Sequence, residues 1–166
     1  MPKIYFFISL ALLLGSCKES ASESVVGQTS DWNVMVEKFQ KKITLSPKAI
    51  ELVAEWKEYN ELERSFDRLY TVENAEDLIL VIEELIEKQK LMEKSVYPKE
   101  LDMPQVKGRQ KVFKTYLLKI KGNLAYRQDP QSSIKEMIDA FNIMRDQFNV
   151  VVNNTLPQDL ISNEEN

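Results

Sequence analysis

Apolar residues recur along most of this chain at steps of three and four, the spacing that places them on one face of an α-helix. Four such stretches run over residues 47–70, 73–95, 104–127 and 130–156. No segment alternates apolar and polar residues over the length of a strand, so the pattern predicts no β-sheet. Four helices of about 22–25 residues with short connections predict an all-α fold, an up-and-down four-helix bundle.

Residues with capping roles indicate where these helices begin. Ser46 before Pro47 predicts an N-cap followed by the first helical position. Either Thr71 or Asn74 is expected to cap the second helix, and Asp129 the last. The predicted core consists of the apolar stripes of the four helices. These stripes are Leu52, Trp56, Tyr59, Leu62, Phe66 and Leu69; Ala75, Leu78, Ile82, Leu85, Gln89, Met92 and Val96; Val106, Gln110, Phe113, Leu117, Ile120 and Leu124; and Ile134, Met137, Ile138, Phe141, Met144, Phe148, Val151 and Val152.

A shorter stretch before the first long helix predicts an extra short N-terminal helix, lying across one end or groove of the bundle. Ser30 or Asp31 would be its cap. Its apolar face would consist of Trp32, Met35, Val36, Phe39 and Ile43. At the other end of the chain, residues 160–161 are expected to fold back onto the bundle and residues 162–166 to fray.

Two glutamines, Gln89 and Gln110, occupy positions in otherwise apolar stripes. Such a side chain is either partly exposed, bonded to water, or placed against a polar cavity inside the bundle. The last alternative makes Gln89 and Gln110 candidate contacts for a small apolar or amphipathic ligand.

The start of the chain has a different composition. Lys3 is followed by an almost unbroken apolar run over residues 4–14, which suits a secretory signal peptide and is too short to span a bilayer. The run ends in Leu14-Gly15-Ser16-Cys17. This tetrapeptide resembles the bacterial lipobox, in which an aliphatic and two small residues precede a cysteine that becomes lipidated. The alternatives are an ordinary cleaved signal with an incidental cysteine, or a buried strand.

The resemblance implies a lipoprotein signal peptide over residues 1–16, a membrane anchor of several acyl chains such as palmitate on Cys17, and export to the cell envelope. Residues 17–30 are small and polar, so we expect a flexible tether before a bundle domain at residues 31–161. Lys18 stands where enterobacterial lipoproteins retained in the inner membrane have aspartate, which favours the outer membrane. The serine-rich start also resembles the tethers of Bacteroidota lipoproteins.

The composition narrows the chemistry. The chain has 166 residues and no histidine, which removes histidine-based acid–base catalysis, Ser-His-Asp and Cys-His nucleophiles and histidine-ligated metals. Its net charge of −4 argues against nucleic-acid binding. Cys17 is the only cysteine, so no disulfide framework is expected. We therefore expect no cofactor, no metal site and no enzymatic activity.

Charges are sorted between two predicted helices. Residues 72–95 carry seven acidic residues and three lysines, whereas residues 103–127 carry seven basic residues and no acidic one. The basic residues Lys107, Lys111, Lys114 and Lys121 fall on one arc beside the apolar face. One interpretation is that neighbouring helices complement each other. The other is a docking face for an acidic partner or an anionic membrane surface.

Gly108, Thr115 and Gly122 recur every seven residues on the basic helix, opposite its apolar stripe. A glycine inside a helix destabilises it by up to about 1 kcal/mol relative to alanine. These glycines are either tolerated at an exposed surface or needed where another backbone approaches closely. With the lysines they form the candidate partner-binding surface.

Two functions follow as hypotheses. The first is a non-enzymatic, lipid-anchored envelope protein that acts as a helical interaction or scaffolding module for a protein partner. The second is a bundle that binds a small ligand in the periplasm or at the cell surface.

Overall fold

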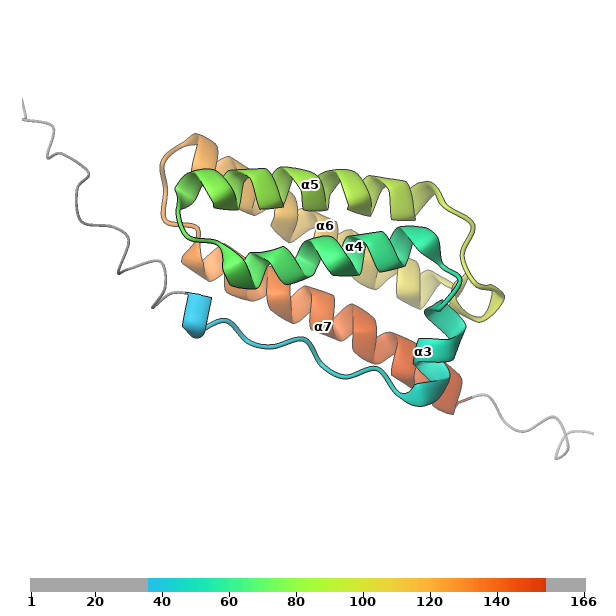
Figure 1. The fold of residues 1–166 in the computed structure, drawn as a ribbon. Helices are drawn as coiled ribbons and strands as arrows, with labels where there is room; N and C mark the ends of the chain where they lie inside the picture. The colour runs from blue at the N-terminus through green and yellow to red at the C-terminus, as the bar shows by residue number, and fades with distance from the viewer. Residues whose placement is uncertain (1–35, 155–166) are drawn as a thin grey trace, which may run out of the picture.

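The computed structural model describes residues 36–154, and this part of the chain contains helices and no strand (Figure 1). The all-α prediction is therefore confirmed for these residues. The elements are α3 (Pro47–Val53), α4 (Lys57–Asp67), the 3-10 helix η1 (Arg68–Thr71), α5 (Ala75–Lys94), the 3-10 helix η2 (Lys99–Leu101), α6 (Pro104–Ala125) and α7 (Gln131–Asn153). The predicted signal peptide, Cys17, the tether and residues 160–166 lie outside the described residues.

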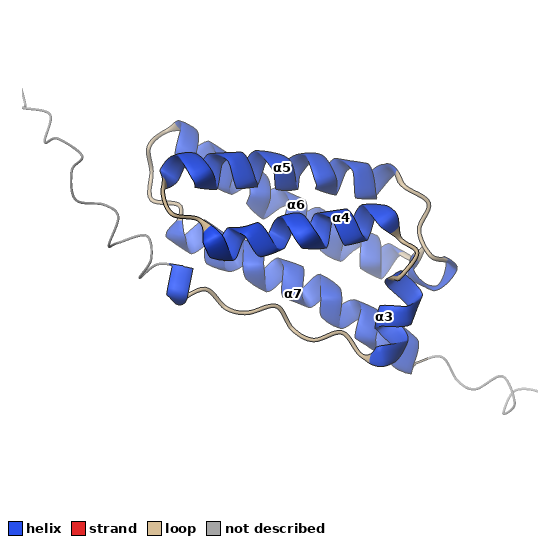
Figure 2. Ribbon diagram, in the orientation of Figure 1, coloured by secondary structure: helices blue, strands red, loops and turns tan. Residues whose placement is uncertain are grey.

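Consecutive helices pack side by side around one apolar core (Figure 2). Helix α4 contacts α5, α5 contacts α6, and α6 contacts α7. Helix α4 also meets α7 through the stacked rings of Phe66 and Phe141, whose centroids lie 4.0 Å apart. The predicted stripe residues are buried in most positions, so the period of the sequence located the core correctly. Val96 is an exception with 92% of its surface exposed, because α5 ends at Lys94 and the chain leaves the core there.

The first long helix predicted over residues 47–70 is interrupted, which corrects that prediction. Helix α3 ends at Val53, and α4 begins at Lys57 after a turn. The Asn60 side chain donates hydrogen bonds to the carbonyls of Val53 and Ala54, groups that a continuous helix would satisfy internally. Trp56 lies buried at the break and donates from Nε1 to Ser95 Oγ at 2.8 Å. The break lets α3 turn aside and pack on α7.

The extra N-terminal helix expected over residues 31–43 is also wrong in its described part. Only Val36 and Glu37 are helical, and residues 40–46 form neither helix nor strand and follow an extended path (Figure 1). This extended segment, called the strap below, runs along the bundle towards α3 (Figure 1). Ile43 and Thr44 are β-branched residues with weak helix propensity, and Pro47 disfavours a helical conformation at Ser46.

Two of the predicted N-caps, Ser46 and Asn74, are confirmed. Ser46 Oγ accepts a hydrogen bond from the Ala49 amide, as expected of an N-cap. Asn74 caps α5 by accepting from the Asp77 amide at 2.8 Å, which decides between it and Thr71. The N-cap of α7 is Pro130 and not the predicted Asp129, although the Asp129 carboxylate accepts from the amide of Gln131, the first residue of α7.

Candidate functional site

The predicted basic surface on α6 is used largely within the fold. Lys114 pairs with Glu93 at 2.6 Å and Lys121 with Glu83 at 3.3 Å, both across to α5. Lys107 pairs with Asp102 in the preceding connection. The hydrogen bond from Lys114 lowers the pKa of the Glu93 carboxyl below its usual value. These contacts agree with the interpretation that neighbouring helices complement each other in charge.

Lys111 differs from the other three lysines. It is exposed, and no ion pair of Lys111 is found among residues 36–154. It lies on α6 between Gly108 and Gly122, where a Cβ built on either glycine would meet no neighbouring segment of the described chain within 4 Å. The described fold therefore gives no packing reason for either glycine.

The two glutamines are buried, but they are satisfied unequally. Gln89 is fully buried, and neither its Nε2 nor its Oε1 makes a hydrogen bond of normal geometry in the described structure, although its amide lies near enough to the Glu93 carboxylate to help lower the pKa of that group. Gln110 accepts a hydrogen bond from the Tyr97 hydroxyl, while its own Nε2 is unpaired. Four cavities on residues 36–154 are lined by other residues and reach neither glutamine.

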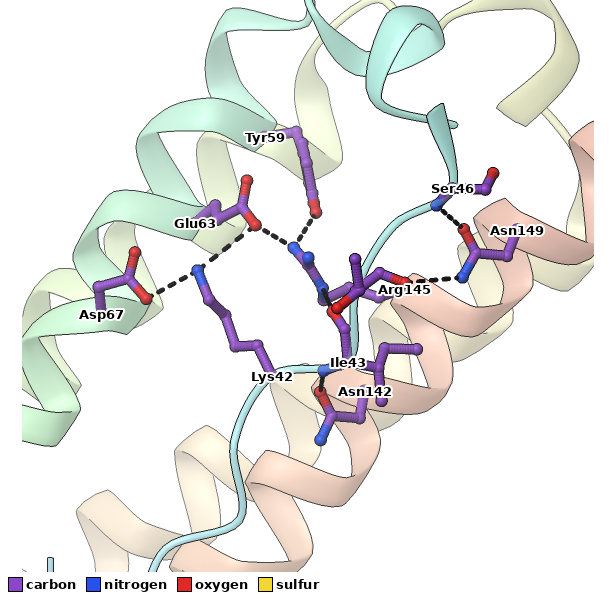
Figure 3. A network of polar contacts seen from close by, with 10 residues as sticks. Lys42, Ile43, Ser46, Tyr59, Glu63, Asp67, Asn142, Arg145 and Asn149 are labelled. Atoms are coloured by element: carbon purple, nitrogen blue, oxygen red, sulfur yellow. Dashed lines mark hydrogen bonds and ion pairs between the residues drawn. The ribbon is translucent and has the colours of Figure 1, made fainter. Parts of the chain in front are cut away.

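The most organised polar arrangement in the described structure lies between the strap and α7 (Figure 3). Asn142 accepts a hydrogen bond from the Ile43 amide at 2.9 Å and donates to the Lys41 carbonyl at 3.0 Å. Asn149 repeats this pattern, accepting from the Ser46 amide at 2.7 Å and donating to the Thr44 carbonyl at 3.1 Å.

Arg145 completes this arrangement from the turn between the two asparagines. Its Nε donates to the Ile43 carbonyl at 3.0 Å. Asn142, Arg145 and Asn149, called the α7 clamp below, thus bind the strap through five hydrogen bonds, all of them to main-chain atoms of the strap.

The guanidinium of Arg145 also links α7 to α4. Only 6% of the residue is exposed, and Nη1 donates to the Tyr59 hydroxyl at 2.7 Å and pairs with Glu63. Burial raises the pKa of Tyr59, so its hydroxyl stays protonated and accepts this bond. A buried arginine needs such partners, because an unpaired charge in the interior is strongly unfavourable.

Side chains of α4 and η1 hold the other side of the strap. Lys42 lies between two carboxylates, 2.7 Å from Asp67 and 3.4 Å from Glu63. The Tyr70 hydroxyl donates to the Gln40 carbonyl at 2.8 Å. Leu45 is the one strap side chain that is buried in the core, with 5% exposure.

Sequence reasoning missed this site. The signals are visible in retrospect. Arg145 stands four residues after Phe141 and three before Phe148, which is a stripe position where an apolar residue belongs. Asn142 and Asn149 are seven residues apart and therefore share a face.

A half-open cavity of about 430 Å³ lies beside this site, between the strap, α3 and α4. Ile43, Leu45, Ile50 and Val53 line it with apolar groups. Its polar end includes Glu63 and Arg145, but each of these already pairs with the other, so the cavity presents no unpaired charge from them.

The described residues contain no cluster of three or more aspartate, glutamate, cysteine or histidine side chains arranged to hold a metal. None of their helices has the length and apolar character needed to cross a membrane. Comparison of the chain with protein-family models, with curated proteins and with solved structures found no match.

Proposed function

We propose that this chain is a non-enzymatic lipoprotein of the cell envelope, a helical interaction module that a lipid on Cys17 holds at the outer membrane. Its helices α4 to α7 would form an up-and-down four-helix bundle, with α3 as an additional short helix. The anchoring half of the proposal is supported by Lys3, the apolar run of residues 4–14 and the Leu14-Gly15-Ser16-Cys17 motif, which occur in the order that a lipoprotein signal requires.

The outer face of α6 supports the proposed role as an interaction module. Gly108 and Gly122 leave open space there, although alanine at either position would stabilise the helix. Lys111 and Thr115 lie between them and are exposed. A face that retains two unfavourable glycines without an internal packing reason is suited to close approach by another backbone.

Anchoring is tested by replacing the cysteine. Wild-type protein should label with palmitate and sediment with membranes, whereas Cys17→Ser should lose the label. Palmitate labelling of the Cys17→Ser variant, or an unlabelled wild-type protein, would contradict the lipoprotein assignment.

The contact face is tested with a photo-crosslinking amino acid at Thr115 in the native envelope, and with the same group at exposed Lys57 on α4 as the control. A defined crosslinked protein should appear from position 115 and not from position 57. Gly108→Gln with Gly122→Gln should abolish this product while the bundle remains folded, because glutamine fills the open space and favours the helix. Identical products from both positions, or a product that survives the glutamine substitutions, would rule out this face.

A further inference from the structure

The strap is held in an unusual way for a segment of a helical bundle. The main chain of the strap is bound by side chains of α7 and not by another main chain. The side-chain amides of Asn142 and Asn149 and the guanidinium of Arg145 provide these hydrogen bonds. Each asparagine uses both ends of its amide, accepting from one residue and donating to the residue two positions earlier. This is the pairing that one β-strand offers to another, supplied here by side chains.

The two asparagines also match the length of an extended chain. Seven residues along α7 separate them by about 10.5 Å at the usual rise of an α-helix. Asn142 binds Lys41 and Ile43, and Asn149 binds Thr44 and Ser46. The two pairs are thus offset by three positions, which is about 10 Å in an extended chain. The α7 clamp therefore recognises an extended main chain in a fixed register.

Two strap side chains add selectivity to this register. Lys42 is bound by the carboxylates of Glu63 and Asp67, and Leu45, three positions later, is buried. The surface of α4 and α7 that the strap covers, called the groove below, thus accepts an extended segment with a basic residue followed, three positions on, by an aliphatic one. The sequence Lys42-Ile43-Thr44-Leu45 of every copy of this chain meets that requirement.

We propose that two copies of this chain exchange their straps, so that the strap of one copy occupies the groove formed by α4 and α7 of the other. Exchange replaces each contact between the strap and α4, η1 or α7 by an identical one from the other copy, which is why swapped segments form dimers with little loss of contact energy. The strap precedes all the long helices and continues into α3 at Ser46, so the change of direction falls at the junction of Ser46 and Pro47 and releases the Ser46 cap of α3.

The strap of the same copy competes for the groove, because it is covalently linked and has a high effective concentration. Confinement of many copies to one membrane raises the concentration of the competing strap, and this part of the inference rests on the proposed lipid anchor. The exchange itself does not, so it is tested with the full mature chain carrying Cys17→Ser, free of lipid. Failure of this test would leave the anchor and the α6 face untouched.

The test pairs two complementary defects. Chain one carries Lys42→Glu and Ile43→Pro. The first substitution places a carboxylate against Glu63 and Asp67, and the second removes the main-chain N–H that donates a hydrogen bond to Asn142. Its groove is intact. Chain two carries Asn142→Ala and Asn149→Ala, which remove four of the five clamp hydrogen bonds and leave its strap intact. Native mass spectrometry of each chain alone and of the mixture measures association.

We expect a one-to-one heterodimer in the mixture and none from either chain alone. Adding the two chain-one substitutions to chain two should abolish the heterodimer. The matched control adds Thr44→Pro and Lys48→Glu to chain two, one proline and one charge reversal at exposed residues, and should keep the heterodimer because both amides bound by the clamp remain. A synthetic peptide of residues 36–48 should compete with it.

Circular dichroism establishes beforehand that each chain is helical. If chain one were unfolded, Lys42→Glu alone would take its place, since that substitution leaves every main-chain donor in position. Two folded chains that stay monomeric when mixed at high concentration would overturn the proposal. A heterodimer that persists when both chains carry Lys42→Glu and Ile43→Pro would also overturn the proposal.

Discussion

Replacing Arg145 by methionine tests whether the buried guanidinium organises the contact between α4, α7 and the strap. Methionine keeps a long, flexible side chain but removes the charge and every donor. The variant loses the ion pair with Glu63, the hydrogen bond to Tyr59 and the hydrogen bond to the Ile43 carbonyl. Tyr59, which has no exposed surface, then loses the donor to its hydroxyl.

The structure sets the expected magnitude. Removing one partner of a buried ion pair destabilises a protein by about 3–5 kcal/mol. The side chain of Glu63 is 25% exposed and keeps Lys42 at 3.4 Å, so the loss should lie near the lower end, about 3 kcal/mol. Tyr59→Phe alone removes one hydrogen bond and should cost about 1 kcal/mol.

A double-mutant cycle separates the Arg145–Tyr59 contact from the rest. In the double variant the hydroxyl that Arg145→Met leaves without its donor is gone, so the combined loss should be smaller than the sum by about 1 kcal/mol. Urea unfolding followed by circular dichroism measures each free energy of unfolding. Arg64→Met on the exposed side of α4 is the control and should change it by less than about 0.5 kcal/mol.

A loss below about 1 kcal/mol for Arg145→Met would refute the reasoning, because it would mean that the guanidinium is not desolvated in the folded protein. Strict additivity of Arg145→Met and Tyr59→Phe would refute the direct contact between the two residues.

Three further predictions concern the helices. Gly108→Ala and Gly122→Ala should each raise the free energy of unfolding by up to about 1 kcal/mol in urea denaturation, since the added methyl group meets open space. Gln89→Met should leave stability unchanged or raise it by about 1 kcal/mol, because it removes two buried polar atoms that lack a hydrogen bond of normal geometry; a marked loss would indicate a bound water or ligand, or a stabilising contact with Glu93. The pKa of Glu93 is lowered in the folded state, so its pair with Lys114 stabilises the bundle above the usual carboxyl pKa and ceases to do so as the pH falls through the lowered value. Thermal unfolding of Lys114→Met should show a smaller loss of stability over that acidic range.

The sequence predicted the parts of the fold that depend on local period and local chemistry. The apolar stripe from Ile134 to Val152 is buried along its whole length, because a period near 3.6 residues directly specifies which face of a helix meets the core. Ser46 and Asn74 were identifiable as caps because a cap acts on amides only two or three positions away.

The parts that sequence reasoning missed depend on contacts between residues about a hundred positions apart. The Ile43 amide and Asn142 are separated by 99 residues, and the Ser46 amide and Asn149 by 103. Ile43 completes the helical stripe of Phe39 and Val36, so the local pattern favours a helix where the clamp imposes an extended chain. Arg145 was missed for a similar reason, because its partners Tyr59 and Glu63 on α4 lie 86 and 82 residues before it.

The way in which the strap is bound also limits how firmly it is bound. Local stability follows the apolar area that a segment buries, and Leu45 is the only fully buried strap side chain. The strap therefore depends on hydrogen bonds and ion pairs, each contributing about 0.5–1.5 kcal/mol net, whereas the long helices bury whole stripes of aliphatic and aromatic residues. We therefore expect the strap, which joins the bundle to the segment that carries Cys17, to open more readily than the long helices. An opening confined to the strap leaves α4 to α7 folded and the clamp free, which is the state that an exchange of straps requires.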